Sequence, residues 1–198
     1  ITISLQLMMF AVMALAAVIA LMTLSVAPNV VDTMSDNVMQ QVAALEQQGE
    51  QDPQSMMPLL TLASAVGMSG LLAYILAVNG LVGVFLGRWM QALAFNPGGF
   101  GEEFRGLRLG IGFSAACFLG NVLLSYQGDQ YWWWSNILAV PLLLVAAAVA
   151  HKAVRIKGLG VQWLVLFYVV ALIMMPVVMS IGFLDAWINF RDRLQKKQ

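Results

Sequence analysis

Long apolar runs alternate with short polar stretches along the whole of this chain. A helix needs about 20 apolar residues to cross the roughly 30 Å hydrocarbon core of a bilayer. Runs of this length recur from end to end, so the pattern predicts an all-α, polytopic transmembrane helical bundle with about five spans. The predicted spans, with approximate bounds, are 5–26, 58–88, 109–126, 133–150 and 161–184.

The stretch 30–54 is acidic, contains no Lys or Arg, and predicts an amphipathic helix outside the membrane. Its apolar residues recur at steps of three and four, which places them on one face of a helix. They are Val31, Met34, Val38, Val42 and Leu45. We expect this outer connector to lie along the membrane surface or to pack on the bundle, and a ligand-gating lid is the alternative.

The run from Pro58 to Phe95 is too long for one simple crossing. A break at Asn79-Gly80 is one interpretation, but a continuous tilted helix that carries Arg88 and Trp89 past the lipid is simpler. Small residues at three- and four-residue steps predict close packing against neighbouring helices. These residues are Ala63, Gly67, Gly70, Gly80, Gly83 and Gly87.

Basic residues predict which side of the membrane each loop faces. They surround the loop 95–108 and occupy the segment 151–160, and two spans separate these segments, so both can face the cytoplasm. The acidic connector then faces outward. A single crossing over 161–184 would place the basic tail outside, whereas a return at Pro176 would place it in the cytoplasm. We expect the single crossing, with the bend as the alternative.

The loop 95–108 is the long polar passage between two apolar runs, and it is the first candidate site. Proline fixes its own φ and glycine accepts positive φ, so a shaped turn is expected, with Gly98, Gly99 and Gly101 in conformations closed to other residues. The following acids fall early in the next helix, and Arg105 and Arg108 are expected on one helical face. The candidate residues are Asn96, Pro97, Gly98, Gly99, Phe100, Gly101, Glu102, Glu103, Phe104 and Arg105.

Three interpretations of this loop stay open. The first is a stapled helix-turn-helix with solvated charges. The second is a docking site whose Phe and Arg side chains anchor a partner, because aromatic residues and arginine dominate interface hot spots. The third is a turn that binds phosphate or carboxylate. In each case we expect Arg105 to make charge-assisted hydrogen bonds, because its planar fork holds two acceptors at once.

The second candidate site is the C-terminal motif that follows the last apolar run. Its residues are Asp185, Trp187, Asn189, Phe190 and Arg191. We expect Asp185 to cap or anchor the helix end at the membrane boundary and to pair with Asn189 four residues on. A proton- or cation-coupled role is the alternative.

The run 88-RWMQALAFNPGGFGEEFRGLRLG-110, together with 182-GFLDAWINFRDRL-194, resembles the YybS-like family of bacterial inner-membrane proteins. That family is a domain of unknown function with a proposed kinship to the S components of energy-coupling-factor transporters. The resemblance implies a multi-pass protein of the bacterial inner (cytoplasmic) membrane. It also implies further helices before Ile1, so we expect the chain to be the C-terminal part of a longer one.

Composition excludes several classes of protein. Hydrophobic residues make up 61% and charged residues 10%, whereas soluble domains carry about 25% charged residues. The net charge is zero, so no nucleic-acid partner is expected. The single cysteine, Cys117, excludes an internal disulfide, and the single histidine, His151, reads as an interfacial residue. We expect no metal and no cofactor.

The aromatic run 131–134 is typical of a membrane-interface belt, with a stacking site for a planar ligand as the alternative. The sequence holds no HExxH, GxSxG or P-loop motif, so we expect a protein that is not an enzyme. By the resemblance, it looks like an S-component-like subunit that binds or transports a small molecule and needs a separate energising partner. Asn79, Asn121 and Asn136 would allow a modest internal cavity.

The alternative function is a scaffold or assembly subunit of a larger membrane protein complex. Its expected partners are the lipid bilayer and a membrane protein or a second copy of this chain.

Overall fold

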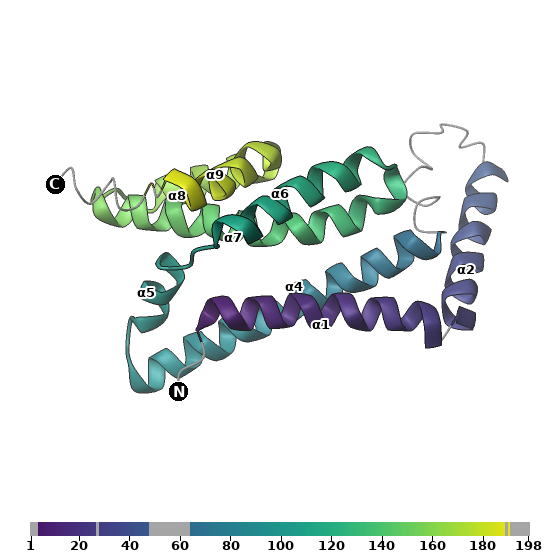
Figure 1. Cartoon of the computed structure of the whole chain (residues 1–198), viewed down its shortest axis with the longest axis horizontal. Coiled ribbons are helices and arrows are strands. Elements are labelled where there is room, and N and C mark those ends of the chain that lie inside the picture. Colours follow the sequence, from purple (N-terminus) through teal and green to yellow (C-terminus); the bar gives the residue numbers. More distant parts are fainter. Residues whose placement is uncertain (1–3, 27, 48–63, 189, 191–198) are drawn as a thin grey trace. The chain divides into compact units, whose positions relative to one another are not determined.

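The computed structural model describes residues 4–26, 28–47, 64–188 and 190, and these residues form helices and turns without any β-strand. Figure 1 shows the helices in chain order. They are α1 (Leu5–Val26), α2 (Pro28–Gln47), α4 (Ala65–Phe95), α5 (Gly99–Arg105), α6 (Ile111–Tyr126), the 3-10 helix η1 (Asp129–Tyr131), α7 (Trp132–Ile156), α8 (Gln162–Ile173) and α9 (Met175–Ile188). The predicted all-α class is confirmed.

The described helices include three that are long and apolar enough to cross a membrane, namely α1, α4 and the continuous segment Asp129–Ile156. The bent pair of α8 and α9 passes the same test when its two helices are taken together, which raises the number to four. Helix α6 is apolar but has only 16 residues. The chain is therefore a multi-pass membrane protein, and the expected number of spans is approximately right.

Helix α4 runs without a break through Asn79-Gly80, as expected, and continues to Phe95. Residues 58–63 of this predicted span lie outside the described residues. Helix α7 also runs further than expected, because residues 151–156 of the predicted basic loop are helical. The helix ends where Gly158 adopts φ 63°, with the Leu159 amide bonded to the Val154 carbonyl at 3.0 Å. Glycine in this left-handed position is the usual stop signal of a helix.

The outer connector contains the predicted amphipathic helix, which is α2. Val31 and Val42 are buried, and Val38 and Leu45 are half-buried. Met34, placed on the same face by the periodicity, is 48% exposed. Residues 48–54 of the predicted connector lie outside the described residues.

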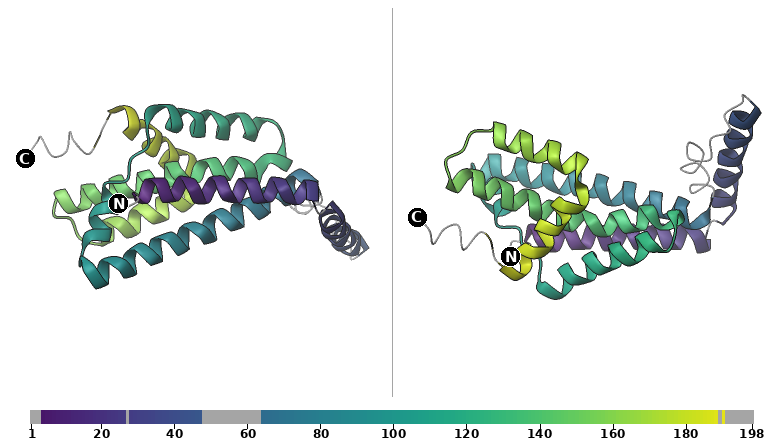
Figure 2. Two further views of the ribbon diagram at one scale, coloured as in Figure 1. Left: turned by 60° about the horizontal axis from the view of Figure 1, so that its bottom comes forward. Right: turned by 90° about the horizontal axis from the view of Figure 1, so that it is seen from above.

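The last apolar run is not one straight helix, because α8 and α9 are bent by 112° at their junction, as in a broken span or a re-entrant loop. Figure 2 shows the two helices turning sharply at their junction. The break lies at Met174, which has φ −124° and ψ 48°. Pro176 explains it, since proline has no N–H to donate and its ring would collide with the carbonyl of Leu172 in a continuous helix. A bend near Pro176 is thus present, and the choice between a single, broken crossing and a return stays a prediction.

The chain divides into two compact units. One comprises Phe10–Val82 and Val122–Ile137, and the other comprises Ile1–Met9, Gly83–Asn121 and Leu138–Gln198. The long helices α1, α4, α6 and α7 each contribute to both.

In the unit with residues 10–82, helix α4 packs closely on α1 and on the start of α7. A Cβ at Gly80 would meet Val12, and a Cβ at Gly70 would lie 2.8 Å from the Trp134 ring. The Trp134 indole donates to the Val66 carbonyl at 3.1 Å, and Trp133 lies 5.3 Å from Tyr74 between ring centroids. The aromatic run therefore contributes to helix packing. Of its three tryptophans only Trp132 is exposed.

The predicted small-residue contacts are thus confirmed at Gly70 and Gly80. They are wrong at Gly83 and Gly87, where a Cβ would meet nothing within 4 Å. Gly67 is buried, and Ala63 lies outside the described residues. The sequence spacing alone does not say which face of the long helix has a neighbour.

In the other unit, α9 packs on α6 and α7. A Cβ at Gly182 would collide with the backbone carbonyl of Leu142, so glycine is what allows the two helices to approach. The rings of Phe118 and Phe183 stack with centroids 4.5 Å apart, and the Ser114 hydroxyl donates to the Phe183 carbonyl at 3.4 Å.

Candidate functional site

The predicted turn at the start of the first candidate site is confirmed. Gly98 adopts φ 89°, and the Gly99 amide bonds to the Asn96 carbonyl at 2.9 Å across Pro97. The glycines that follow do not extend the turn, because α5 already begins at Gly99. Glu102 and Glu103 fall inside this short helix, as expected.

Two details of the loop prediction are wrong. Gly99 and Gly101 are helical, so their backbone conformations are open to other residues. A Cβ at Gly99 would collide with the Asn96 side chain, whereas a Cβ at Gly101 would meet only the flexible end of Arg105, 3.0 Å away. Arg108 does not share a helical face with Arg105, because α5 ends at Arg105.

Glu103 is the centre of a polar contact that joins three helices. Its carboxylate accepts hydrogen bonds from Arg88 of α4, at 2.6 Å from Nη2 and 3.1 Å from Nε. It also accepts the backbone N–H of Leu5 at 2.9 Å. Leu5 is the first residue of α1, where the amide has no intrahelical acceptor and the helix dipole favours negative charge. One carboxylate therefore neutralises an arginine and caps a helix.

The arginine that pairs with Glu103 is Arg88, and the expected charge-assisted hydrogen bonds of Arg105 stay a prediction. Arg88 also donates to Gln91 at 3.0 Å. The clue available in the sequence was that Arg88 and Glu103 both fall in the run 88–110, but their pairing depends on the path of the turn between them. Partial burial lowers the pKa of the Arg105 guanidinium; nearby Arg155 adds to this effect and Glu102 opposes it.

Phe100 and Phe104 pack against their own protein. Their ring centroids lie 6.2 Å and 6.0 Å from that of Phe85. Phe104 and His151 make an edge-to-face contact with ring centroids 5.6 Å apart. The His151 Nε2 and the Tyr168 hydroxyl share a hydrogen bond of 2.9 Å. These rings connect α4, α5, α7 and α8, so they are poorly placed as free docking anchors.

The C-terminal motif is only partly described, since Asn189 and Arg191 lie outside the described residues. Trp187 is 55% exposed and Phe190 is half-buried. Asp185 is 2% exposed, so its carboxyl group packs inside the protein, and its expected role as an anchor at the membrane boundary stays a prediction. It continues the buried stripe of α9, whose members follow helical spacing. They are Val178, Met179, Gly182 and Asp185.

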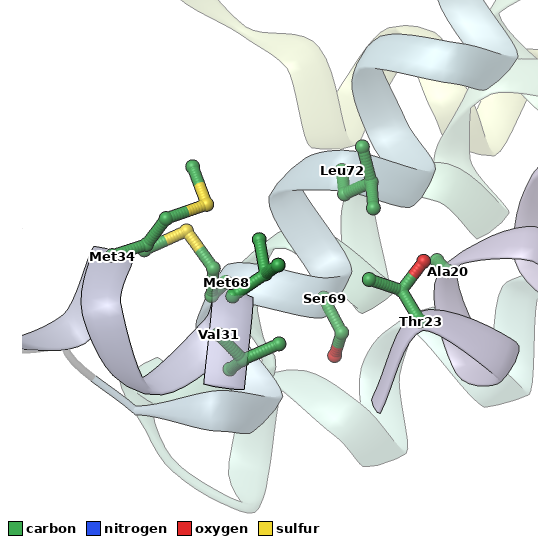
Figure 3. A pocket seen from close by; sticks show the side chains of 8 residues that line it. Ala20, Thr23, Val31, Met34, Met68, Ser69 and Leu72 are labelled. Atoms are coloured by element: carbon green, nitrogen blue, oxygen red, sulfur yellow. The ribbon is translucent and has the colours of Figure 1, made fainter. Parts of the chain in front are cut away.

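A cavity of about 190 Å³ lies among α1, α2 and α4, and Figure 3 shows its lining at close range. Helix α1 contributes Ala20 and Thr23, helix α2 contributes Val30, Val31 and Met34, and helix α4 contributes Met68, Ser69 and Leu72. All these residues belong to the unit with residues 10–82.

The sequence predicts a cavity near polar residues within the spans, whereas this cavity has a mainly apolar lining. Asn79 and Asn136 do not converge on it. Their amide groups donate to carbonyls of their own helices, at Ile75 (2.8 Å) and Trp132 (2.7 Å). A useful signal was the apolar face of the connector, whose Val31 and Met34 line the cavity.

Within the described part of the chain, no three His, Cys, Asp or Glu residues come together as a metal site. No family model, curated protein or solved structure matches this chain. The candidate sites therefore rest on their geometry.

Proposed function

We propose that this chain is a membrane-embedded subunit that binds a small molecule among its helices and works with a separate energising partner. The cavity among α1, α2 and α4 is the observation that carries the proposal. Helices α1 and α4 are both candidate membrane spans, so the cavity lies where a membrane protein can receive a ligand from the bilayer or from its surface.

The sequence supports the need for a partner. The 198 residues contain no P-loop spacing, so the proposal assigns any ATP-driven work to a separate partner. The resemblance of residues 88–110 to the YybS-like family supports the proposal. It favours an S-component-like role and a location in the bacterial inner membrane.

Ligand binding can be tested on the full chain purified in mild detergent. Extraction followed by mass spectrometry should recover a small molecule bound in constant proportion to the protein. Met34→Trp places a large ring at the cavity and should abolish its recovery. Met39→Trp is the matched control, because Met39 has the same 48% exposure on the same helix but does not line the cavity. Equal recovery from the two variants would reject this cavity as the ligand site.

A scaffold or assembly role is the second candidate, and α8 is the observation that favours it. Apart from Gln162 and the Tyr168 hydroxyl, this helix is apolar, yet none of its residues is buried. Exposed large side chains on α8 include Trp163, Val165, Leu166, Leu172 and Ile173. A helix of this kind is covered by lipid or by another protein chain.

One pull-down separates the two roles. The protein is captured in mild detergent and its companions are identified by mass spectrometry. An ATPase module among them supports the energised binding subunit. A constant set of membrane proteins that remains after Met34→Trp, without any bound small molecule in the wild-type protein, supports the assembly role.

A further inference from the structure

Resting on the proposed function, we infer that the cavity among α1, α2 and α4 takes an uncharged aromatic group about the size of one ring. Four features of the site favour this occupant: the hydrogen-bonding capacity of the lining, the volume of the cavity, its two methionines and the position of the nearby acids.

The lining offers a ligand little hydrogen bonding. Its two hydroxyl groups donate to carbonyls of their own helices, Thr23 to Ile19 at 2.9 Å and Ser69 to Val66 at 3.0 Å. The remaining side chains that line it are aliphatic or thioether groups. A buried polar group that finds no partner costs free energy, and a buried charge costs far more. Anions and carboxylic acids are therefore excluded first, because neither hydroxyl has a spare hydrogen to donate.

The volume of about 190 Å³ matches a small hydrophobic molecule. An engineered apolar cavity of about 150 Å³ in another protein binds benzene or xenon. The present cavity can thus accept one substituted ring but not a large polar cofactor.

Two methionines from different helices favour an aromatic occupant. Met34 lies on α2 and Met68 on α4, and Figure 3 shows both side chains near one another at the cavity. Thioether sulfur makes favourable contacts with ring edges, and the flexible side chain adapts to the shape of the occupant. Met68 is buried, whereas Met34 is half exposed and is the side chain that can move to admit a ligand.

The acids of α2 do not add a charge to this site. Asp32 and Asp36 are both exposed. Each is two positions from Met34, which is about 160° around the helix at 3.6 residues per turn. A cationic ligand therefore gains no carboxylate partner from these residues, and an uncharged ligand is the better match.

The test uses methyl NMR of the full chain in lipid nanodiscs with ¹³C-methyl methionine. Signals of Met34 and Met68 are assigned by Met→Leu variants, and Met90, which is 64% exposed on α4, reports general partitioning. Toluene, benzoate and benzylammonium serve as probes with one ring and different charge. We expect toluene alone to shift both cavity methionines saturably, without a saturable shift at Met90.

Substitutions test whether toluene binds in this cavity and whether the binding depends on apolar contacts. Thr23→Val keeps the shape of the cavity and removes a hydroxyl, so toluene binding should be unchanged or tighter. Met34→Trp should weaken the saturable shift at Met68 at least about tenfold, equivalent to about 1.4 kcal/mol. Met39→Trp should leave it unchanged. Loss of toluene binding in Thr23→Val would overturn the apolar class, because a more apolar wall of the same shape should hold an uncharged ring at least as well.

The same experiment distinguishes a free compound from a lipid acyl chain, which shares the apolar chemistry. Nuclear Overhauser effects from lipid-chain protons to Met34 and Met68, lost on adding toluene, would identify a lipid chain as the resident group. Their absence, with saturable toluene binding, would identify a free ring compound.

Two outcomes overturn the inference in different ways. Saturable shifts with benzoate or benzylammonium but not with toluene would reject the uncharged class and leave the binding-subunit proposal standing. If no probe shifts Met34 and Met68 saturably and nothing co-purifies with the protein, both the ligand class and the proposed function fail.

Discussion

A single carboxylate, that of Glu103, makes two contacts that connect three helices. Glu103 holds Arg88 of α4 and caps the first amide of α1. Both members of the ion pair are largely shielded from solvent, with side-chain exposures of 17% for Arg88 and 28% for Glu103. Shielding strengthens charge-assisted hydrogen bonds relative to a surface pair.

Glu103→Gln should lower the free energy of unfolding by roughly 1.5–3 kcal/mol, the range for hydrogen bonds to charged groups. Thermal unfolding in detergent, followed by circular dichroism, measures it. Glu102→Gln is the control: Glu102 is exposed on the same helix, and its substitution should change stability by less than about 0.5 kcal/mol. Equal effects would show that Glu103 has no special structural role.

The glycines of the turn should respond differently to alanine. Gly98 has φ 89°, so Gly98→Ala should destabilise the protein by roughly 1–2 kcal/mol. Gly101 is helical, so Gly101→Ala should stabilise it by up to about 1 kcal/mol if the flexible end of Arg105 moves aside. The same unfolding assay measures both effects. Equal decreases in the free energy of unfolding of the two variants would contradict this expectation.

At the scale of helices, close approach depends on which residue faces a neighbour and not on the small-residue pattern alone. Gly182 lies against the backbone of Leu142, whereas Gly87 faces open space. The same residue type therefore allows close packing at position 182 of α9, whereas a side chain at position 87 of α4 would have no contact partner.

Gly182→Ala should push α9 away from α7 and cost about 1–3 kcal/mol, as overpacking does. Gly87→Ala should instead gain about 0.5–1 kcal/mol, because alanine is the better residue inside a helix. Unfolding of the two variants side by side in one detergent measures both effects. A Gly182→Ala protein as stable as the wild type would mean that α7 and α9 do not approach as closely as the structure shows.

At the scale of the whole molecule, a return of the chain at the bend near Met174 would remove a conflict between hydropathy and charge. A straight last span would place the basic tail on the side opposite the basic segments around residues 105 and 155. A return of α9 allows the end of that helix to lie on the same side as the loop that precedes α8, in agreement with the preference of basic residues for the cytoplasm.

Single cysteines in a Cys117→Ser background should reveal this topology. With a membrane-impermeant maleimide, we expect Lys157→Cys and Trp187→Cys to be labelled from the cytoplasmic side and Glu46→Cys from the opposite side. Cys117 is buried, so the unsubstituted protein gives the background level of labelling. Labelling of Trp187→Cys together with Glu46→Cys would support a single crossing instead of the return.

The sequence by itself determined the features that depend on near neighbours along the chain. Hydropathy over about 20 residues indicated membrane helices, because the bilayer core has a set thickness. A step of three and four residues identified α2 and the buried positions Val31 and Val42. Local turn chemistry likewise located the bend at residues 96–98 before α5.

Only the tertiary structure decided which distant residues meet. The bond between Leu5 and Glu103 joins positions 98 residues apart, and the cavity needs three separate helices. Burial of Asp185 likewise depends on the helices that surround α9, which its own spacing does not identify. Pairing and enclosure follow from three-dimensional distances, and many helix arrangements satisfy the same hydropathy pattern, so no local signal could select among them.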